Sequence, residues 1–442
     1  MVFLENIWWY LVLIGVMILL HELGHFLAAR LFDVKVETFS FGFGPRLFGF
    51  RHGDTDFRFS ALPILGGYVK MAGDQPGDEA AAADPRSLIA KPRWQRLIIT
   101  FAGPAVNVIL AVVLLAGLFM EHYPKVPTPR DPLVGYLAPD GAAAKAGIHE
   151  GDRVVQVDDM TDPNWEDIAL KEIASAKRPM QVWVMRNGQR LHFTIVPALD
   201  EKEGIGVAGW GQQTQVQVGS VAPGMEAQRA GLQAGDILLS ANGQPLRSVS
   251  GLYDIEKATN GKPIDLVYLR KGSQHEVTVT PAKAPDPDAA GQQRWMIGLT
   301  VESRIEITKL PFLAAVRESW RWNAQNAKLI FQFLEGMLER RMSPKSIVGP
   351  VGIAAMSGEA ARQGAASYFS LMAAVSLNLA IFNLLPIPIL DGGVIMMLLV
   401  EMLMRRELDL RVKEAVVKVG FLFLMVVVVF VIYNDISKML PG

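Results

Sequence analysis

The sequence predicts a multi-domain membrane protein with a four-span α-helical membrane core, a membrane-associated β-hairpin or small sheet, and two small α/β domains in an extracytoplasmic insert. Half of the 442 residues are apolar and the mean hydropathy is +0.25, which is high for a soluble enzyme. Four segments are apolar enough to cross a bilayer, and one pattern occurs twice between the second and the third of them. The length also favours several structural units over one core.

The expected spans are four apolar stretches of bilayer length. They are Ile7–Phe32, Leu97–Met120, Tyr368–Met404 and Val416–Tyr433. The third is longer than one crossing requires, and Pro386, Pro388 and the pair Gly392-Gly393 interrupt it, so we expect a broken helix there. No Lys or Arg precedes Arg30. The first stretch therefore lacks the charged start of a signal peptide and is expected to be a retained helix.

Basic residues predict the orientation of the spans. The loop between the first and second spans is rich in Lys and Arg, and the loop between the third and fourth carries Arg405, Arg406, Arg411 and Lys413. The positive-inside rule places both loops in the cytoplasm. Both chain ends and the long insert after the second span are then expected outside.

The insert contains two copies of one sequence pattern. The motif with Ala146-Gly147 and Gly151-Asp152 recurs 84 residues later at Ala230-Gly231 and Gly235-Asp236. Each copy has short β-type runs between Gly and Pro turns and one helical stretch. A constant offset of this kind predicts two copies of one small α/β domain.

Two further segments have a clear periodicity. Phe39–Gly44 and Asp56–Leu62 alternate with period two and are followed by Pro63, which predicts a β-hairpin or small sheet. Its aromatic residues suggest that it dips into the membrane, where strand edges are tolerated only if protein or a cavity shields them. Residues 312–341 have apolar residues at helical spacing interrupted by charges, which favours an interfacial or packing helix over a span.

The first span carries His21, Glu22 and His25 in the pattern HELGH. Two imidazoles at i and i+4 lie on one face of a helix and can hold one Zn²⁺, with the Glu between them as a general base. Ionisable groups at the bilayer centre cost about 3 kcal/mol each on insertion scales, so their presence indicates function. The alternative is a polar cluster at a helix–helix contact.

A catalytic zinc also needs a third protein ligand and an open position for water. Asp391 is the candidate, because a lone acid in an apolar span should be paired or metal-bound. The first and third spans run in the same direction, and Asp391 lies at a depth similar to that of His21. Asn383 is a candidate for hydrogen-bonding a substrate backbone or an oxyanion, or for bridging two helices. Asn107 in the second span is interpreted as helix packing.

Composition excludes several other classes. The net charge of −1 gives no indication of a nucleic-acid partner. The chain has no Cys, which removes disulfides, thiol chemistry and Cys-type zinc sites.

Several motifs together resemble one family. HELGH, FAGPAVN in the second span and NLLPIPILDGG in the third resemble the site-2 intramembrane zinc metalloproteases, and the two AxxAGxxxGD repeats look like tandem PDZ domains. FGFGP, LGGYVKM and YNDISKM extend the resemblance over nearly the full length. Val394 departs from it, because some members have His at this place, but that His is not a metal ligand in the family.

The resemblance implies a set of roles. His21, His25 and Asp391 would hold Zn²⁺, Glu22 would activate the water, and Asn383 would contact the substrate backbone. The PDZ pair would lie in the periplasm, on the outer side of a bacterial inner membrane, and would screen out substrates with bulky outer domains. The substrates would be single-span membrane proteins already trimmed outside, of the anti-sigma factor type, and remnant signal peptides.

On this interpretation the chain has five parts. Residues 1–120 form the first two spans with the β-loop, 121–208 and 209–305 the two PDZ domains, 306–364 an amphipathic helix and linker, and 365–442 the last two spans. A transmembrane helix hides its peptide bonds in its own hydrogen bonds. We therefore expect a locally unwound substrate to add as a strand to the edge at Phe57–Leu62, with Phe57, Phe59 and Ala61 as its contacts.

Two alternatives belong to other classes. One is a non-catalytic membrane receptor that binds chain ends through PDZ domains and holds a structural metal. Three protein ligands argue against it, because structural zinc sites are usually closed by four. The other is a metal transporter, which would need more acidic or His residues along the spans than the sequence offers.

Overall fold

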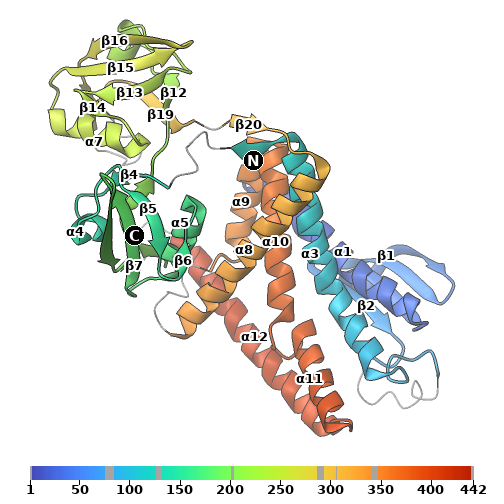
Figure 1. The fold of residues 1–442 in the computed structure, drawn as a ribbon. Helices are drawn as coiled ribbons and strands as arrows, with labels where there is room; N and C mark the ends of the chain where they lie inside the picture. Colours follow the sequence, from blue (N-terminus) through green and yellow to red (C-terminus); the bar gives the residue numbers. More distant parts are fainter. Residues whose placement is uncertain are drawn as a thin grey trace. The chain divides into compact units, whose positions relative to one another are not determined.

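The computed structural model describes residues 2–74, 84–125, 132–200, 204–285, 293–304, 306–339 and 347–439. The chain separates into two compact units (Figure 1). The first comprises residues 1–123, 309–331 and 347–442, and the second comprises residues 124–308 and 332–346.

The first unit is built around long apolar helices. Its helices are α1 (Val2–Leu31), α3 (Arg93–Glu121), α8 (Phe312–Leu338, of which residues 312–331 belong here), α9 (Pro350–Gln363), α10 (Ala365–Leu384), α11 (Asp391–Met404) and α12 (Leu410–Met439). Among the described residues, α1, α3, α10 and α12 are long and apolar enough to cross a membrane. Each contains or overlaps one of the four expected spans, which agrees with a multi-pass membrane protein.

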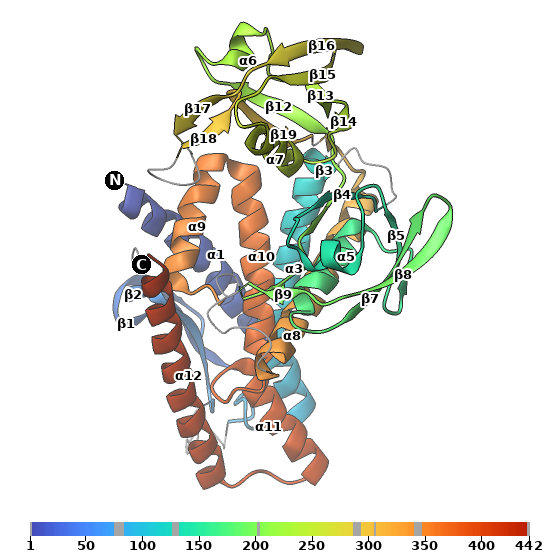
Figure 2. The ribbon, with the colours of Figure 1, turned by 90° about the vertical axis from the view of Figure 1, so that its left-hand side faces the viewer.

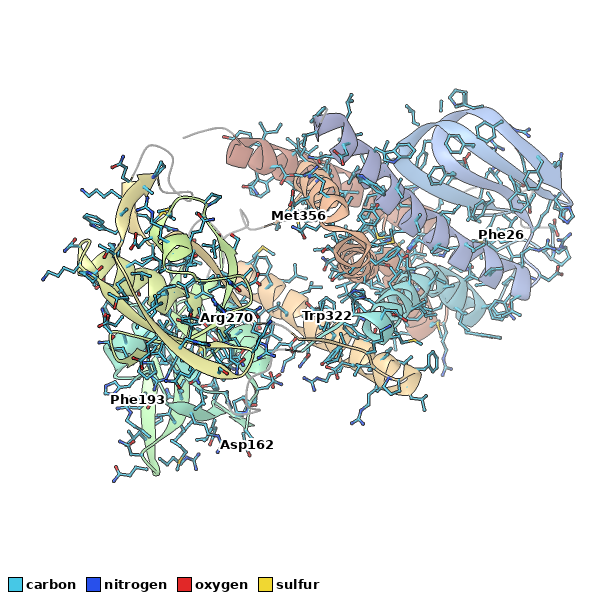
Figure 3. The ribbon with its side chains drawn as sticks, turned by 90° about the horizontal axis from the view of Figure 1, so that it is seen from above. Phe26, Asp162, Phe193, Arg270, Trp322 and Met356 are labelled. Carbon is cyan, nitrogen blue, oxygen red and sulfur yellow. The ribbon has the colours of Figure 1, made fainter. Side chains whose placement is uncertain are left out.

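Helix α3 is the centre of this unit, because α1 and α10 both pack against it (Figures 1 and 2). Leu115 and Phe119 of α3 are buried with Leu377 and Ile381 of α10. The first part of α8 packs on the same cluster, and Trp322 belongs to that contact (Figure 3). The interfacial-or-packing helix expected at residues 312–341 is therefore a packing helix over its first part. Its expected last residues lie outside the described residues.

The third span is broken, as the sequence predicts. Helix α10 ends at Leu384, a six-residue segment with Pro386 and Pro388 follows, and α11 begins at Asp391. Proline supplies no backbone N–H and disfavours helix in the residue before it, which explains the interruption.

The two strands β1 (Val36–His52) and β2 (Thr55–Met71) each bend and pair twice. Phe57 pairs with both Phe39 and Phe50, while Phe41 pairs with both Phe59 and Gly67. The spatial order is therefore residues 46–52, 55–60, 36–43 and 66–71. Phe26 of α1 packs edge-on against Phe39 and Phe57 and joins the sheet to the helix (Figure 3).

The second unit contains the two repeat copies, each with its own hydrophobic core. The first copy has β4 (Val134–Leu137), α4 (Ala142–Ala146), β5 (Arg153–Val157), β6 (Met160–Thr161), α5 (Trp165–Ala174), β7 (Met180–Arg186), β8 (Gln189–Ile195), β9 (Ala198–Leu199), β10 (Gly206–Val207) and β11 (Trp210–Gln212). The second has β12 (Val216–Val221), α6 (Glu226–Arg229), β13 (Ile237–Ala241), β14 (Gln244–Pro245), α7 (Val249–Thr259), β15 (Ile264–Arg270), β16 (Ser273–Val279), β17 (Ala282–Pro285), β18 (Gln293–Met296) and β19 (Leu299–Ser303). Two short strands, β3 (Tyr123–Lys125) and β20 (Glu306–Thr308), flank them in sequence.

The two copies make the same contacts 84 residues apart. Arg186 donates to Asp152 and to the carbonyl of Gly147, and Arg270 donates to Asp236 and to the carbonyl of Gly231. The strand order β6-β5-β7-β8 in the first copy corresponds to β14-β13-β15-β16 in the second. The sequence repeat is therefore a structural repeat.

Candidate active site

The three expected metal ligands come together in the first unit. His21 and His25 lie one turn apart on α1, and their Nε2 atoms are 3.2 Å from each other. Asp391 Oδ2 lies 3.2 Å from His21 Nε2, and Asp391 Oδ1 lies 3.6 Å from His25 Nε2. One ligand atom from each residue falls within 4.8 Å of the others, so the three can share one ion.

The segment before α11 aims Asp391 at the histidines. Ile389 has φ 94°, a strained conformation for a β-branched residue, directly before the turn into α11. A Cβ on Gly392 would lie 2.3 Å from the carbonyl oxygen of Leu384, and a Cβ on Gly393 would lie 2.4 Å from that of Ile387. Only glycine allows the segment to fold back so closely on the start of α11, which explains the Asp-Gly-Gly sequence.

Helix α3 approaches the histidines at two glycines. A Cβ on Gly24 would lie 2.5 Å from the carbonyl oxygen of Ala102, so α1 and α3 touch here through backbone. A Cβ on Gly103 would lie 2.3 Å from His25 Nε2 and 2.9 Å from His21 Cε1. Gly103 therefore leaves the space in which the two ligand nitrogens meet.

The hydrogen bonds around the histidines suit a divalent metal such as zinc. His25 Nδ1 donates to the Ile99 carbonyl oxygen at 2.8 Å, which leaves the Nε2 lone pair directed toward Asp391. His21 Nδ1 lies 3.2 Å from the side-chain amide of Asn107, which is fully buried on α3. Asn107 was expected to serve helix packing. The structure instead places its side chain against a metal-ligand candidate, and only the long-range packing of α1 on α3 reveals this.

Glu22 faces the sheet. Its carboxylate accepts a hydrogen bond from the Val69 backbone N–H, and its Cγ lies 3.3 Å from the position of a Cβ on Gly67. The segment 66–71 is an outer strand of the sheet, and among the described strands its pairing partner is β1 on one side. A strand edge and a candidate general base therefore lie side by side.

Two of the residues expected to contact a substrate strand, Phe57 and Phe59, do not lie on an edge of the sheet. Phe57 and Phe59 belong to the segment 55–60, which pairs with β1 residues on both sides, and their rings stack on Phe50 and Phe48. Their backbone groups are used inside the sheet, because β1 bends back and covers them. Ala61 follows this segment directly in the chain. Asn383, in contrast, reaches the site: its Nδ2 lies 3.5 Å from His21 Nε2.

Residues 9–427 match the family model of peptidase family M50. The chain belongs to this family. It is 30% identical to the regulator of sigma-E protease RseP of Escherichia coli and to RseP of Salmonella typhimurium, over 99% of this chain and 99% of each relative. A protein of Neisseria meningitidis, whose name assigns it to the zinc metalloproteases, is 30% identical over 96% of this chain and 97% of its own length.

Solved structures match shorter parts of the chain. A PDZ domain of the SdrC-like protein of Listeria monocytogenes is 21% identical over 21% of this chain and 90% of its own, with a TM-score of 0.18.

Family membership decides the class of activity. The chain is an intramembrane zinc metalloprotease, and the prediction of this enzyme class is confirmed. The motifs FGFGP, LGGYVKM and YNDISKM also pointed, within this family, to the regulator of sigma-E protease, and this resemblance holds over nearly the full length. The receptor and transporter alternatives are not supported.

Proposed function

We propose that this enzyme cleaves single-span transmembrane segments, with His21, His25 and Asp391 as the zinc ligands and Glu22 as the general base. The observation that supports the proposal most strongly is the meeting of the three ligand atoms within 4.8 Å, with Glu22 on the same helix turn and beside a strand edge. Three protein ligands leave a position for water, as catalytic zinc sites do.

The chemistry of these side chains assigns each of them a role in the reaction. When bound here, Zn²⁺ would polarise the scissile carbonyl and acidify the attacking water. The Glu22 carboxylate takes the proton from that water and passes it to the leaving amine. Asn383, 3.5 Å from His21 Nε2 through its amide nitrogen, is placed to donate to the substrate carbonyl oxygen as charge develops there.

The substrate strand is proposed to add to the edge at residues 66–69. The Val69 N–H points out of the sheet toward Glu22, and Gly67 lies in the same row, so a strand paired here would run past the catalytic base. Unwinding the substrate helix exposes peptide groups that need partners in the membrane, and the edge supplies them. This proposal replaces the edge expected at Phe57–Leu62.

The remaining assignments rest on the relatives and the sequence. The names of two relatives describe regulators of sigma-E, so we propose anti-sigma factor-type proteins, trimmed outside the membrane, and signal peptide remnants as substrates. We propose that residues 121–208 and 209–305 are PDZ domains in the periplasm of a bacterial inner membrane, with both chain ends on that side. Their shared fold and separate cores support two equivalent modules.

Co-expression with a tagged single-span substrate that lacks its outer domain tests the function. The native chain is expected to cleave it. Glu22→Gln is expected to keep its zinc and its fold and to slow cleavage by at least about 100-fold, because a general base contributes that much or more. Cleavage at the native rate by Glu22→Gln would contradict the assigned role.

A further inference from the structure

Asn107 lies on α3, two turns after Ile99, and its side chain is completely buried. Its Nδ2 is 3.2 Å from His21 Nδ1, while its Oδ1 has no hydrogen-bond partner within the described part of the chain. We propose that Asn107 is a positioning residue for His21: its side-chain oxygen accepts a hydrogen bond from Nδ1–H and directs Nε2 toward the metal position. This inference rests on the proposed zinc site.

The tautomer of His21 decides how the amide must be turned. Nε2 is the nitrogen that faces Asp391 and His25, so it must carry a lone pair to serve as a ligand, and the ring proton then sits on Nδ1. In the amide orientation that places Nδ2 3.2 Å from His21 Nδ1, the Asn107 NH₂ group faces that N–H, and two donors meet. Rotation of the amide by a half turn exchanges two atoms of nearly equal shape. It ends the donor–donor contact with His21 and places the NH₂ group where the oxygen had no partner among the described residues.

Helix α3 then supports the two histidines in the same manner. Ile99, Gly103 and Asn107 are four residues apart and share one face of α3. The Ile99 carbonyl accepts from His25 Nδ1, and Gly103 leaves the space between the rings. With its amide turned, Asn107 accepts from His21 Nδ1, which lies 3.2 Å from the end of its side chain. An acceptor is needed at each end because each imidazole must present Nε2 to the same point.

Asn107 is itself held in place from a second helix. Ser376 of α10 is buried and donates from Oγ to the Asn107 backbone carbonyl at 2.8 Å. The same helix carries Asn383 near His21. The amide therefore sits at the junction of α1, α3 and α10. A packing role alone would not require its polar end to point at a metal-ligand candidate.

The test compares two variants whose side chains have the same number and branching of heavy atoms as Asn. Asn107→Leu removes the acceptor and adds no buried polar group, whereas Asn107→Asp keeps an oxygen at the same place. Purified full-length protein in detergent is loaded with Zn²⁺, and zinc retention is measured against a competing chelator. We expect Asn107→Leu to bind zinc about 10- to 100-fold more weakly, as for other partners of metal-bound histidine. Asn107→Asp is expected to stay within a few-fold of the native affinity.

Two controls separate the outcomes. Gly117→Ala lies on the same helix, where an added Cβ would meet nothing within 4 Å, and should leave zinc affinity within a few-fold of native. Thermal melting of the metal-free variants checks that they fold. Because Leu suits an apolar interior, the zinc affinity of Asn107→Leu tests the need for an acceptor even if Asn107→Asp misfolds. Native zinc affinity in Asn107→Leu, or equal loss in a folded Asn107→Asp, would overturn the inference. Absence of zinc from the native protein would instead overturn the proposed site.

Discussion

Gly103 contributes to the site by the space that it leaves. A methyl group at this position would lie 2.3 Å from His25 Nε2, well inside van der Waals contact. Because the methyl group would be attached directly to the backbone of α3, it could not turn away from the ring. We expect Gly103→Ala to displace the histidine rings and to lower zinc affinity by at least about 10-fold, comparable to the loss of a partner of a metal ligand. Zinc content after dialysis against a chelator measures this.

The matched control lies on the same helix. A Cβ on Gly117 would meet nothing within 4 Å, so Gly117→Ala should keep native zinc content and should stabilise α3 slightly, since Ala is the better helix former. Equal zinc binding by both variants would show that the space beside His25 is not needed.

Single residues also show what a sequence can predict about this site. Asp391 was predictable because an acid in an apolar stretch requires a partner, and the histidines provide one. Asn107 was not, because an amide in a membrane helix is equally suited to packing and its contact depends on where α1 crosses α3. Local patterns reveal unusual residues, whereas their partners follow from tertiary packing.

At the level of the strands, pairing register decides which edge faces the base. The alternation at 39–44 and 56–62 correctly predicted a sheet, but not that β1 bends and pairs on both sides of the segment 55–60. Bulges and bends of this kind use glycines with positive φ, such as Gly42 and Gly44. The sequence shows the glycines, but the pairing register that results from them is visible only in the folded sheet. The outer strand near Glu22 is thus the segment 66–71, whereas residues 57 and 59 pair on both sides.

Proline at position 69 tests this edge. Val69→Pro removes the N–H that points at Glu22 and blocks strand addition there, so cleavage should slow by at least about 10-fold, the equivalent of one or two lost hydrogen bonds. Zinc content should stay native. Val69→Ala keeps the N–H and is the matched control. An unchanged rate in Val69→Pro would remove strand addition at this edge from the mechanism.

Each repeat also joins its longer helix to a segment later in the chain through a Glu, which is half-buried in the first copy and buried in the second. Glu172 of α5 accepts from the Ala208 N–H and the Trp210 indole, and Glu256 of α7 accepts from the Ile297 N–H. Burial raises the pKa of Glu172, and it raises the pKa of Glu256 from its ordinary value of 4.5 to about 7. The charged form of Glu256 is thus costly in the folded state.

This pKa gives the second repeat a defined pH dependence. Because the folded pKa lies above the unfolded one, the unfolded chain loses its proton first as pH rises from 4.5 to 7. Stability then falls through this window, by roughly 3 kcal/mol at most. We expect amide exchange of α7 in the intact chain to be faster at pH 8 than at pH 5 after correction for intrinsic rates. Glu256→Gln should flatten this dependence, whereas Glu276→Gln, at an exposed position, should not.

At the scale of the whole molecule, the candidate site lies in one of the two compact units. The helical unit contains all three ligand candidates and Glu22, and the repeat unit has its own hydrophobic cores. The four long apolar helices found among the described residues were predictable, because a run of about twenty apolar residues has few other stable environments. How a span breaks at Leu384 and resumes at Asp391 required the structure, because Pro and Gly indicate a break but not its geometry.

The absence of Cys from the chain makes its orientation directly measurable. Gln189→Cys introduces one thiol at an exposed position of the first repeat, and Arg406→Cys introduces one at an exposed position between α11 and α12. If the basic loops are cytoplasmic, a membrane-impermeant maleimide should label Gln189→Cys in spheroplasts and should label Arg406→Cys only after the membrane is permeabilised. Both variants keep the ligand candidates intact and should retain zinc. Labelling in the reverse order would place the repeats in the cytoplasm, and the repeats could then not act on the outer side of a substrate.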